Sequence, residues 1–377
     1  MKKIIIIEFV HYQYALTLTE IFKGNEIIYI FSNKIYDALK NFEPNFNSTN
    51  VWIYDNTQMK ENIDEIISRI NSVNADLLCI DPIFDNFQYF AKLVKKVKVK
   101  KLFTTHNINT WFRPKIKSIG NLKEKYYKKK IINNVDYIAV EDFIYQYITE
   151  EEKRLFSKYK FVYIPYTIFY PDRVNKIVRN NNKIKIVLPG SIDYERRRYE
   201  TVIETIKTVF EISNKYIFSF AGPAIGEYGT RILKELKALK KMQPENIIVF
   251  ENKPKPNEFR REMESADIVL STSTRYFKGL GTIERIGQTK PTAAIHDMIT
   301  FVLPGILPKH LRIPEGMRSS SLLYDNAKEL TDIILGLDKG NKLSVLKKEA
   351  EKNSKKFTAK EIIKRNSEIF KKILDFD

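Results

Sequence analysis

The fold of this chain is decided by the stretch Ser271-Thr-Ser-Thr-Arg-Tyr-Phe-Lys-Gly279-Leu-Gly281-Thr282-Ile-Glu284, which follows an apolar run typical of a buried parallel strand. The pattern predicts a strand, then a glycine turn, then the start of a helix that carries Glu284 about one turn inside. Glycines let the backbone approach a ligand, amides at a helix N-terminus attract phosphate, and a carboxylate accepts hydrogen bonds from sugar hydroxyls. The stretch therefore predicts a site for a nucleoside diphosphate, with Gly281 and Thr282 on the diphosphate and Glu284 on the ribose. A turn that needs glycine for structural reasons alone is the other interpretation.

Length and composition predict two compact α/β domains. The chain has 377 residues, of which 43% are hydrophobic and 12% aromatic, and this is enough for two cores. A single cysteine, Cys79, and four histidines exclude a disulfide framework and a cysteine-rich zinc site. No apolar run reaches the roughly 20 residues of a membrane-spanning helix, and Met1 leads into a strand-like run without a signal-peptide pattern. We expect a cytoplasmic protein, either soluble or peripheral on the inner face of the membrane.

The formal net charge of +18 comes from 64 basic and 46 acidic side chains and favours anionic partners. Sugar nucleotides, lipid head groups and nucleic acid all satisfy this condition, so charge does not choose among them. The abundance of Lys, Ile and Asn also fits a compositional bias of the source genome, which would explain part of the excess.

Buried-strand patterns alternate with amphipathic helical patterns in both halves, which predicts wound, Rossmann-like domains with parallel sheets. Residues 171–183 have no clear periodicity and are the expected linker, so we place one domain at residues 1–175 and a second at 184–350. We expect the carboxyl ends of their strands to face each other across a cleft, because ligands of open parallel sheets bind there. The predicted strands are 4–7, 26–31, 51–54, 77–80, 101–105, 137–140 and 161–164 in the first half, and 185–188, 218–221, 247–250, 268–271 and 292–295 in the second.

A second candidate phosphate site follows the first strand of the second half, in Pro189-Gly190-Ser191-Ile-Asp193-Tyr-Glu195-Arg196-Arg197-Arg198. Three consecutive arginines in a strand-to-helix loop offer planar donors that can hold a diphosphate and neutralise charge on a leaving group. A solvated surface run is the alternative, but the position in the loop favours phosphate contact by at least one of the arginines.

With these two motifs, the second half resembles the nucleotide-binding domain of a GT-B glycosyltransferase, closest to glycosyltransferase family 4 and its relatives. In that family a Gly-Arg loop with a Glu-Lys pair follows the first strand of the domain, and Gly190 with Glu195-Arg196 matches this pattern. The resemblance implies that Arg196 stands for the phosphate-binding lysine. Ser191 replaces the family's arginine, so that phosphate contact is either missing or supplied by Arg197 or Arg198.

The family's glycine-rich turn, ribose-binding glutamate and Gly-Lys-Pro ending resemble Gly279 to Glu284 and Thr289-Lys290-Pro291. The family usually has another glutamate eight residues before the ribose-binding one; Tyr276 stands there, so the two-glutamate motif is half present. The resemblance implies a GT-B fold in which residues 1–175 bind the acceptor and 184–350 bind the nucleotide sugar. It also implies that a C-terminal helix, residues 351–377, packs back on the N-terminal domain.

Two histidines at predicted strand ends are the candidate catalytic residues. His106 closes the strand 101–105, and the resemblance implies that it touches the donor sugar or its phosphate. His11 follows the first strand, where some inverting GT-B enzymes carry a general base, and an imidazole suits removal of a proton from an acceptor hydroxyl. A structural role is the alternative for both. Glu8 is a less favoured base because it falls inside the strand pattern, and Asp142 is another acid at a strand end.

Metal-ligand spacing of histidines or cysteines is absent, since there is no His-x-x-x-His and no pair of cysteines. We expect a metal-free mechanism without a cofactor, in which a UDP- or GDP-linked sugar is the co-substrate. Arginines and helix amides would stabilise the departing diphosphate. His296 and Asp297 are expected in a solvated loop after the strand 292–295, at most bordering the donor site.

Aromatic and cationic side chains are interleaved from Trp111 to Lys130, and six further lysines lie in residues 92–101. Such a surface suits an anionic membrane, with aromatics at the interface and lysines in the field of the lipid head groups. A solvated lysine-rich helix is an equally good interpretation.

The main hypothesis is a glycosyltransferase that moves a sugar from a nucleoside-diphosphate donor to a glycan, lipid-linked or protein-linked acceptor. A nucleotide-sugar 2-epimerase has the same two-domain layout, but it needs clustered carboxylates and histidines for proton transfer, and the sequence shows no such cluster. A nucleic-acid-binding protein is the third hypothesis, including a glycosyltransferase that acts on a DNA base.

Overall fold

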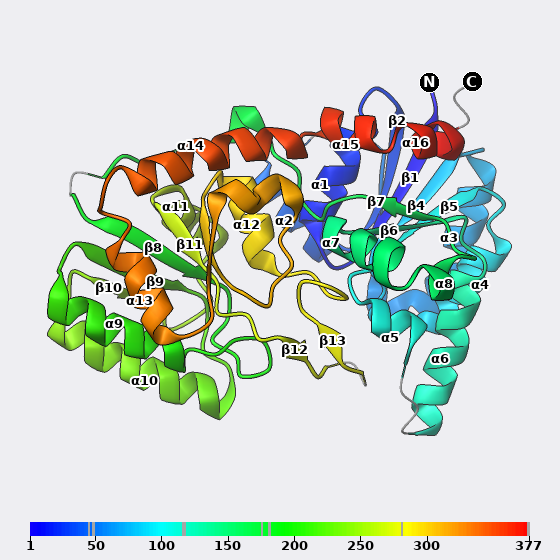
Figure 1. Cartoon of the computed structure of the whole chain (residues 1–377). Coiled ribbons are helices and arrows are strands. Elements are labelled where there is room, and N and C mark those ends of the chain that lie inside the picture. Colours follow the sequence, from blue (N-terminus) through cyan, green and yellow to red (C-terminus); the bar gives the residue numbers. More distant parts are fainter. Residues whose placement is uncertain are drawn as a thin grey trace. The chain divides into compact units, whose positions relative to one another are not determined.

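The computed structural model describes residues 1–43, 46, 50–114, 118–174, 176–179, 182–279 and 282–374. The chain forms two compact units (Figure 1). Unit 1 comprises Met1–Thr167, Gly279–Glu284 and Ala359–Asp377, and unit 2 comprises Ile168–Lys278 and Arg285–Thr358. Each unit has a parallel sheet with helices on its faces, so the predicted α/β class with two wound domains is confirmed.

Unit 1 has a seven-stranded sheet in the order β3-β2-β1-β4-β5-β6-β7, and every pairing is parallel. The strand order reverses between β1 and β4, which is the position where open parallel sheets bind ligands. Its strands are β1 (Lys3–Glu8), β2 (Glu26–Phe31), β3 (Val51–Ile53), β4 (Leu77–Ile80), β5 (Lys100–Thr104), β6 (Tyr137–Val140) and β7 (Phe161–Tyr163).

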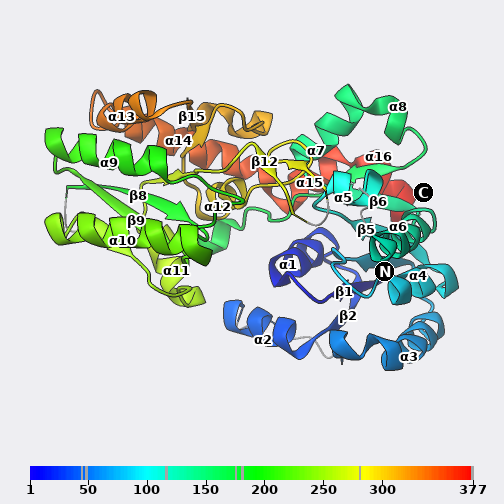
Figure 2. The same cartoon turned by 90° about the horizontal axis from the view of Figure 1, so that it is seen from below.

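Both faces of this sheet are buried, which explains why β1 and β4 read as unbroken apolar runs. Helices α3, α4 and α6 share a hydrophobic core with one face, while α1 packs beside the C-terminal α15 on the other (Figures 1 and 2). The helices and short turns before residue 167 are α1 (Tyr12–Ile21), α2 (Asn33–Phe42), η1 (Asn56–Gln58), α3 (Met59–Ser72), α4 (Phe87–Lys96), α5 (Ile108–Phe112), α6 (Ile119–Ile132), α7 (Asp142–Gln146), η2 (Tyr147–Glu151) and α8 (Lys153–Phe156).

Unit 2 has a six-stranded parallel sheet in the order β10-β9-β8-β11-β14-β15 and a separate two-stranded sheet of β12 and β13. Its strands are β8 (Ile184–Pro189), β9 (Tyr216–Ala221), β10 (Ile247–Val249), β11 (Ile268–Leu270), β12 (Tyr276–Phe277), β13 (Glu284–Arg285), β14 (Gly305–Pro308) and β15 (Ser321–Tyr324). The helices are η3 (Pro171–Arg173), α9 (Glu200–Ile212), α10 (Gly226–Met242), α11 (Pro256–Glu264), α12 (Ala293–Phe301), η4 (Glu315–Ser320), α13 (Ala327–Leu335), α14 (Lys342–Ser354) and η5 (Lys355–Phe357).

Two local predictions in unit 2 are wrong. Residues 292–295 are not a strand, because Thr292 is the N-cap and the next three residues open α12. The buried members of α12 are Ala294, Ile295, Met298 and Ile299, a helical spacing that a short apolar run did not reveal. Glu284 does not lie inside a helix either, because it is the first residue of β13.

The C-terminal segment returns to unit 1 as α15 (Ala359–Arg365) and α16 (Ser367–Leu374). Phe370 of α16 contacts Phe22 of α1 with ring centroids 6.0 Å apart. Between the two helices, Asn366 is buried, and its Nδ2 donates to the carbonyl of Tyr163 at 2.9 Å. The end of the chain is therefore fastened to the last strand of the unit 1 sheet by a side-chain hydrogen bond.

We expect Asn366→Ala to destabilise the protein by about 1–3 kcal/mol, because it leaves a buried carbonyl without its donor. Urea denaturation measures the loss, and amide hydrogen exchange of residues 359–374 locates it. Lys360→Ala on the exposed face of α15 is the control. Equal stability of the two variants would show that the bond to Tyr163 does not hold the segment.

Candidate active site

In unit 1 a buried polar side chain follows the carboxyl end of each of four neighbouring strands. Glu8 ends β1, Asp81 follows β4, His106 lies two residues after β5, and Glu141 follows β6. Each of these residues is at most 9% exposed. His11 lies just before α1, with its ring 5.5 Å from that of His106, so the structure brings the two predicted catalytic histidines together.

Tyr166 completes this histidine pair. Its ring lies 5.4 Å from that of His11 and 5.1 Å from that of His106, and its backbone N–H donates to Glu141 Oε1 at 2.7 Å. Burial, with the nearby carboxyl of Glu8, raises the pKa of Tyr166 well above its ordinary value. The phenol therefore keeps its proton at neutral pH and can act as a hydrogen-bond donor.

The expectation that this protein lacks clustered carboxylates and histidines is wrong. Glu8, Asp81 and Glu141 surround the histidine pair, although they are far apart in the sequence. The signal was present, because each acid stands at or directly after the end of a predicted parallel strand, and such ends meet at one edge of the sheet. Glu8 was set aside as a strand residue, and Asp81 was not considered.

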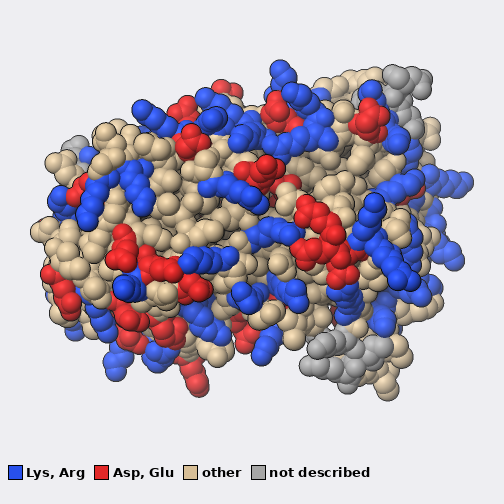
Figure 3. All heavy atoms as spheres, viewed as in Figure 1, with Lys and Arg blue, Asp and Glu red and all other residues tan. Residues whose placement is uncertain are grey.

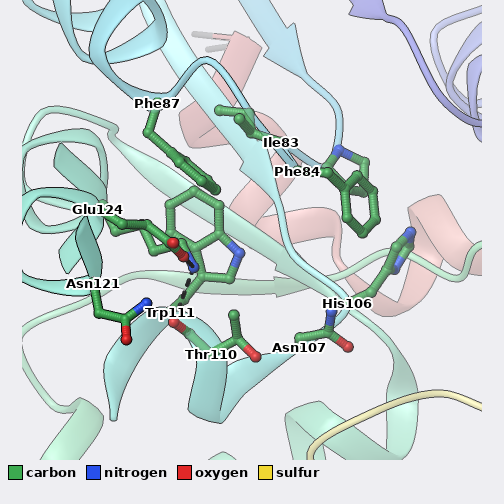
Figure 4. Close-up of a pocket in the computed structure, with 11 residues that line it drawn as sticks. Ile83, Phe84, Phe87, His106, Asn107, Thr110, Trp111, Asn121 and Glu124 are labelled. Atoms are coloured by element: carbon green, nitrogen blue, oxygen red, sulfur yellow. Dashed lines mark hydrogen bonds and ion pairs between the residues drawn. The ribbon is translucent and has the colours of Figure 1, made fainter. Parts of the chain in front are cut away.

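Next to His106 lies a pocket of about 270 Å³, close to the lower end of the usual range for small-molecule sites. In Figure 4, His106 and Asn107 lie toward one end, with Asn121 and Glu124 of α6 toward the other. In the same view (Figure 4) the rings of Phe84, Phe87 and Trp111 lie on one side of the pocket, and the polar side chains of Asn107, Thr110 and Asn121 lie on the other. The lining residues are Pro82, Ile83, Phe84, Phe87, His106, Asn107, Thr110, Trp111, Asn121, Glu124 and Lys128.

Lys128 is almost fully buried in the wall of this pocket. Its ammonium forms an ion pair with Glu124 and lies 4.7 Å from the ring centre of Phe87 and 5.4 Å from that of Trp111. Burial lowers the pKa of Lys128, while Glu124 and then Glu284 oppose this shift. The buried cation is therefore balanced by protein carboxylates.

Glu284, the predicted ribose ligand, is fully buried in unit 1. Its Oε1 accepts hydrogen bonds from the backbone N–H of Thr110 at 2.7 Å and from the Thr110 hydroxyl at 2.9 Å, and its Oε2 accepts from the N–H of Asn109 at 3.2 Å. The carboxylate thus fastens residues 279–284 to α5. Thr282 is buried in the same segment, Gly281 lies outside the described residues, and the ligand roles of all three stay predictions.

In unit 2 the loop after β8 is built around Gly190, whose φ of +92° lies in the left-handed region. A side chain here would place its Cβ only 2.3 Å from Nη2 of Arg197. Arg197 Nη1 donates to the carbonyl of Ser191 at 3.0 Å, so the guanidinium is folded over its own loop. The absence of a Cβ at Gly190 thus lets an arginine lie against the turn that follows the first strand of the unit.

Arg196 has a different environment. Its side chain is half exposed, forms an ion pair with Asp193 at 3.5 Å, and lies 5.4 Å from the ring centre of Phe277. Lys290 approaches the same ring, with its Nζ 4.9 Å from the centre. Arg196 and Lys290, which belong to separate sequence motifs, therefore both contact the ring of Phe277 and bring two positive charges close to it. Arg198 instead stacks on Tyr194 at 3.5 Å.

Asp297 lies about one turn inside a helix of unit 2, the position that was predicted for Glu284 from the sequence. It belongs to α12, whose N-cap Thr292 is bonded to Ser273, two residues after the strand end marked by Ser271. Burial raises the pKa of Asp297 to about 7, and the positive charges of His296 and Arg197 oppose the shift. Asp297 was expected in a solvated loop because α12 was not predicted.

Among the described residues, no group of three or more His, Cys, Asp or Glu is arranged to hold a metal ion. None of the helices in the described ranges combines the length and the hydropathy that a membrane span requires. The metal-free and cofactor-free mechanism stays a prediction.

No protein-family model matches the chain, and the curated proteins contain no match. Solved structures match over the whole chain. A glycosyltransferase from Rickettsia africae has 16% identity and a TM-score of 0.64, with 100% of this chain and 99% of that chain covered. HepE of Anabaena, solved with UDP-glucose, has 10% identity and a TM-score of 0.65, with 99% and 100% covered. A putative UDP-N-acetylglucosamine 2-epimerase from Listeria monocytogenes has 12% identity and a TM-score of 0.56, with 100% and 97% covered. The chain therefore has the GT-B fold, as predicted, whereas the closer resemblance to family 4 stays a prediction.

Proposed function

We propose that this protein is a glycosyltransferase that transfers a sugar from a UDP- or GDP-linked donor to a glycan, lipid-linked or protein-linked acceptor. The observation that carries the proposal is the arrangement in unit 2, where Gly190 admits Arg197 against the first turn and Asp297 lies in the field of that arginine. Arginine and free backbone amides recognise a diphosphate, and a carboxylate recognises vicinal hydroxyls. The complexes of HepE with UDP and UDP-glucose support this assignment.

In this proposal unit 2 stabilises the leaving group. Arg196 and Arg197 neutralise the charge that develops on the diphosphate as the bond from its oxygen to the sugar carbon breaks. The backbone amides at the start of α12 face the same charge, and Asp297 accepts hydrogen bonds from ribose hydroxyls. Asp297 would then take the role that the sequence assigned to Glu284.

Unit 1 would bind and activate the acceptor. His11 takes the proton of the acceptor hydroxyl while the oxygen forms its bond to the sugar carbon, and His106 contacts the donor sugar. The pocket beside His106 holds the sugar unit on which the reaction occurs, with Trp111 as its aromatic wall and Asn107 as a hydrogen-bonding partner.

A nucleotide-sugar 2-epimerase is a second candidate, because buried carboxylates do surround the histidine pair and one structural neighbour is a putative epimerase. Product analysis separates the two. Incubation with UDP- and GDP-sugars and a panel of glycan acceptors should yield a glycosylated acceptor with one nucleoside diphosphate released per transfer. An isomerised free nucleotide sugar, formed without an acceptor, would establish the epimerase instead.

We expect UDP or GDP to raise the melting temperature of the wild type, since a ligand at 100 times its Kd stabilises the native state by about 2.7 kcal/mol. At pH 8, where Asp297 is ionised, Asp297→Asn should weaken nucleotide binding roughly tenfold to a hundredfold, because it removes a charge-assisted hydrogen bond. Glu284→Gln should keep the nucleotide-induced shift and lower only the baseline melting temperature. If Glu284→Gln lost the nucleotide-induced shift and Asp297→Asn kept it, Glu284 rather than Asp297 would be the ribose ligand.

We also propose that unit 1 contacts an anionic membrane through α6. Ile119, Leu122 and Tyr126 share one side of this helix and are 86%, 53% and 53% exposed. Exposed lysines flank this stripe at positions 123, 125, 129 and 130, and further exposed lysines lie on α4, which packs against α6. Lysines and arginines are also numerous at the side of the surface that unit 1 occupies (Figure 3). An apolar stripe with lysines beside it is the pattern of an interfacial helix.

We expect the protein to cosediment with vesicles that contain anionic phosphatidylglycerol and much less with pure phosphatidylcholine, and salt should weaken the binding. Leu122→Ser with Ile119→Ser should abolish binding without altering the nucleotide-induced shift in melting temperature. Ile212→Ser, an exposed apolar residue of unit 2, is the control. Equal sedimentation of both variants would remove α6 as the contact.

A further inference from the structure

The register of the unit 1 sheet places two carboxyl groups side by side. Strands β1 and β4 are neighbours, and Ile7 pairs with Ile80. The residue after Ile7 is Glu8, and the residue after Ile80 is Asp81. These two acids therefore lie side by side at the carboxyl edge of the sheet. Glu8 has no exposed surface and Asp81 is 3% exposed.

The hydrogen bonds of these two carboxyls are unequal. Glu8 Oε1 accepts from the backbone N–H groups of Val10 and His11, the second at 2.7 Å. Glu8 Oε2 and both oxygens of Asp81 have no donor within the described part of the chain. No lysine or arginine there forms an ion pair with either carboxyl.

Two buried carboxylates in contact cannot both be ionised without a cation, because repulsion and lost hydration add together. One proton between them removes the repulsion and also supplies the donor that Glu8 Oε2 lacks. The two backbone donors favour the charge on Glu8. We propose that Asp81 keeps its proton at neutral pH and donates it to Glu8, so that the pair carries a single negative charge behind His11 and His106.

The groups that face this pair from the neighbouring elements are consistent with a single charge. Burial raises the pKa values of Tyr14 on α1 and Cys79 on β4 well above normal, so neither supplies a second anion. Tyr166, after β7, also stays neutral. Burial, and then the charge of Glu8, raises the pKa of Asp81 itself. Glu141 after β6 is the remaining acid, and it accepts the Tyr166 N–H.

One anion at this position would act on the histidines, and this part of the inference rests on their proposed role in catalysis. Glu8 is bonded directly to the backbone of His11, whose ring contacts that of His106. A negative charge favours the imidazolium form and raises the pH at which an imidazole becomes a neutral base. Glu8 and Asp81 are thus positioning residues that set the proton affinity of the histidine pair.

The test compares Asp81→Asn, Glu8→Gln and the double variant by NMR titration of the histidine ring protons. The signals are assigned with His11→Gln and His106→Gln, and His296 and His310 of unit 2 are internal references. Asp81→Asn retains the Glu8 carboxylate, so the midpoints of His11 and His106 should stay at their wild-type values. Glu8→Gln leaves only the buried, protonated Asp81, so in this variant and in the double variant the charge is lost and the midpoints should fall by about one pH unit, a tenfold change in proton affinity.

Other outcomes overturn the proposal. Lower midpoints in Asp81→Asn as well would show that the pair carries two charges, and unchanged midpoints in the double variant would show that its charge does not reach the histidines. If the double variant does not fold, the pH dependence of unfolding decides. Because Asp81 keeps its proton when folded and loses it when unfolded, the unfolding constant of the wild type should rise tenfold per pH unit above about pH 4, relative to Asp81→Asn. A constant ratio between the two proteins would refute the retained proton.

These measurements do not require an activity. If no sugar transfer is found, the proposed function fails, while the titrations still decide the state of the pair. If transfer is found, the acidic limb of its pH–rate profile should move in Glu8→Gln and in the double variant but not in Asp81→Asn, which a purely structural role would not produce.

Discussion

The candidate sites depend on one constraint: a parallel sheet buried on both faces leaves only its edges for polar side chains. In β1 the residues Ile4 to Ile7 are at most 2% exposed, so the first acid of that path, Glu8, comes at the carboxyl end. The same holds for Asp81 after β4 and Glu141 after β6. In unit 2 the six residues of β8 are all buried, including Lys185, which is paired with Glu262, and the arginine loop that begins at Gly190 follows the carboxyl end of this strand.

The same constraint explains how much could be predicted. Unbroken apolar runs identified the two wound domains, the seven strands of the unit 1 sheet and four of the six strands of the unit 2 sheet, whereas β14 and β15 were not predicted. Such runs are informative because the pattern depends only on local sequence. His11 and His106 were found for the same reason, as polar residues at strand ends. Their proximity to Glu8 and Asp81 could not be derived, since it depends on which strands are neighbours, and strand order is a property of the whole sheet.

One strand prediction in unit 2 was wrong, because the same short apolar sequence is compatible with a strand and with the first turn of a helix. Residues 292–295 are a short apolar run, and such a run does not distinguish a buried strand from the first turn of a helix. With residues 292–295 predicted as a strand, Asp297 is expected in a loop and Glu284 is the carboxylate expected at the ribose. In the structure, Glu284 uses both oxygens to hold α5, whereas Asp297 lies inside a helix and in the field of Arg197. Hydrogen-bond partners, rather than position in a motif, distinguish the two acids.

The two units also differ in the sign of the charge at their strand ends, and this difference supports the proposed division of the substrates between them. Arg196, Arg197 and Lys290 make the edge of unit 2 cationic. The edge of unit 1 is acidic, since Glu8, Asp81 and Glu141 lie there. A diphosphate would be repelled by the acids of unit 1 and attracted by the guanidinium groups of unit 2. A histidine that removes a proton from a neutral hydroxyl instead needs a negative charge nearby, because the anion stabilises the imidazolium that forms. The net charge of +18 therefore matters less than its distribution, and that distribution suits a nucleotide in unit 2 and a neutral acceptor in unit 1.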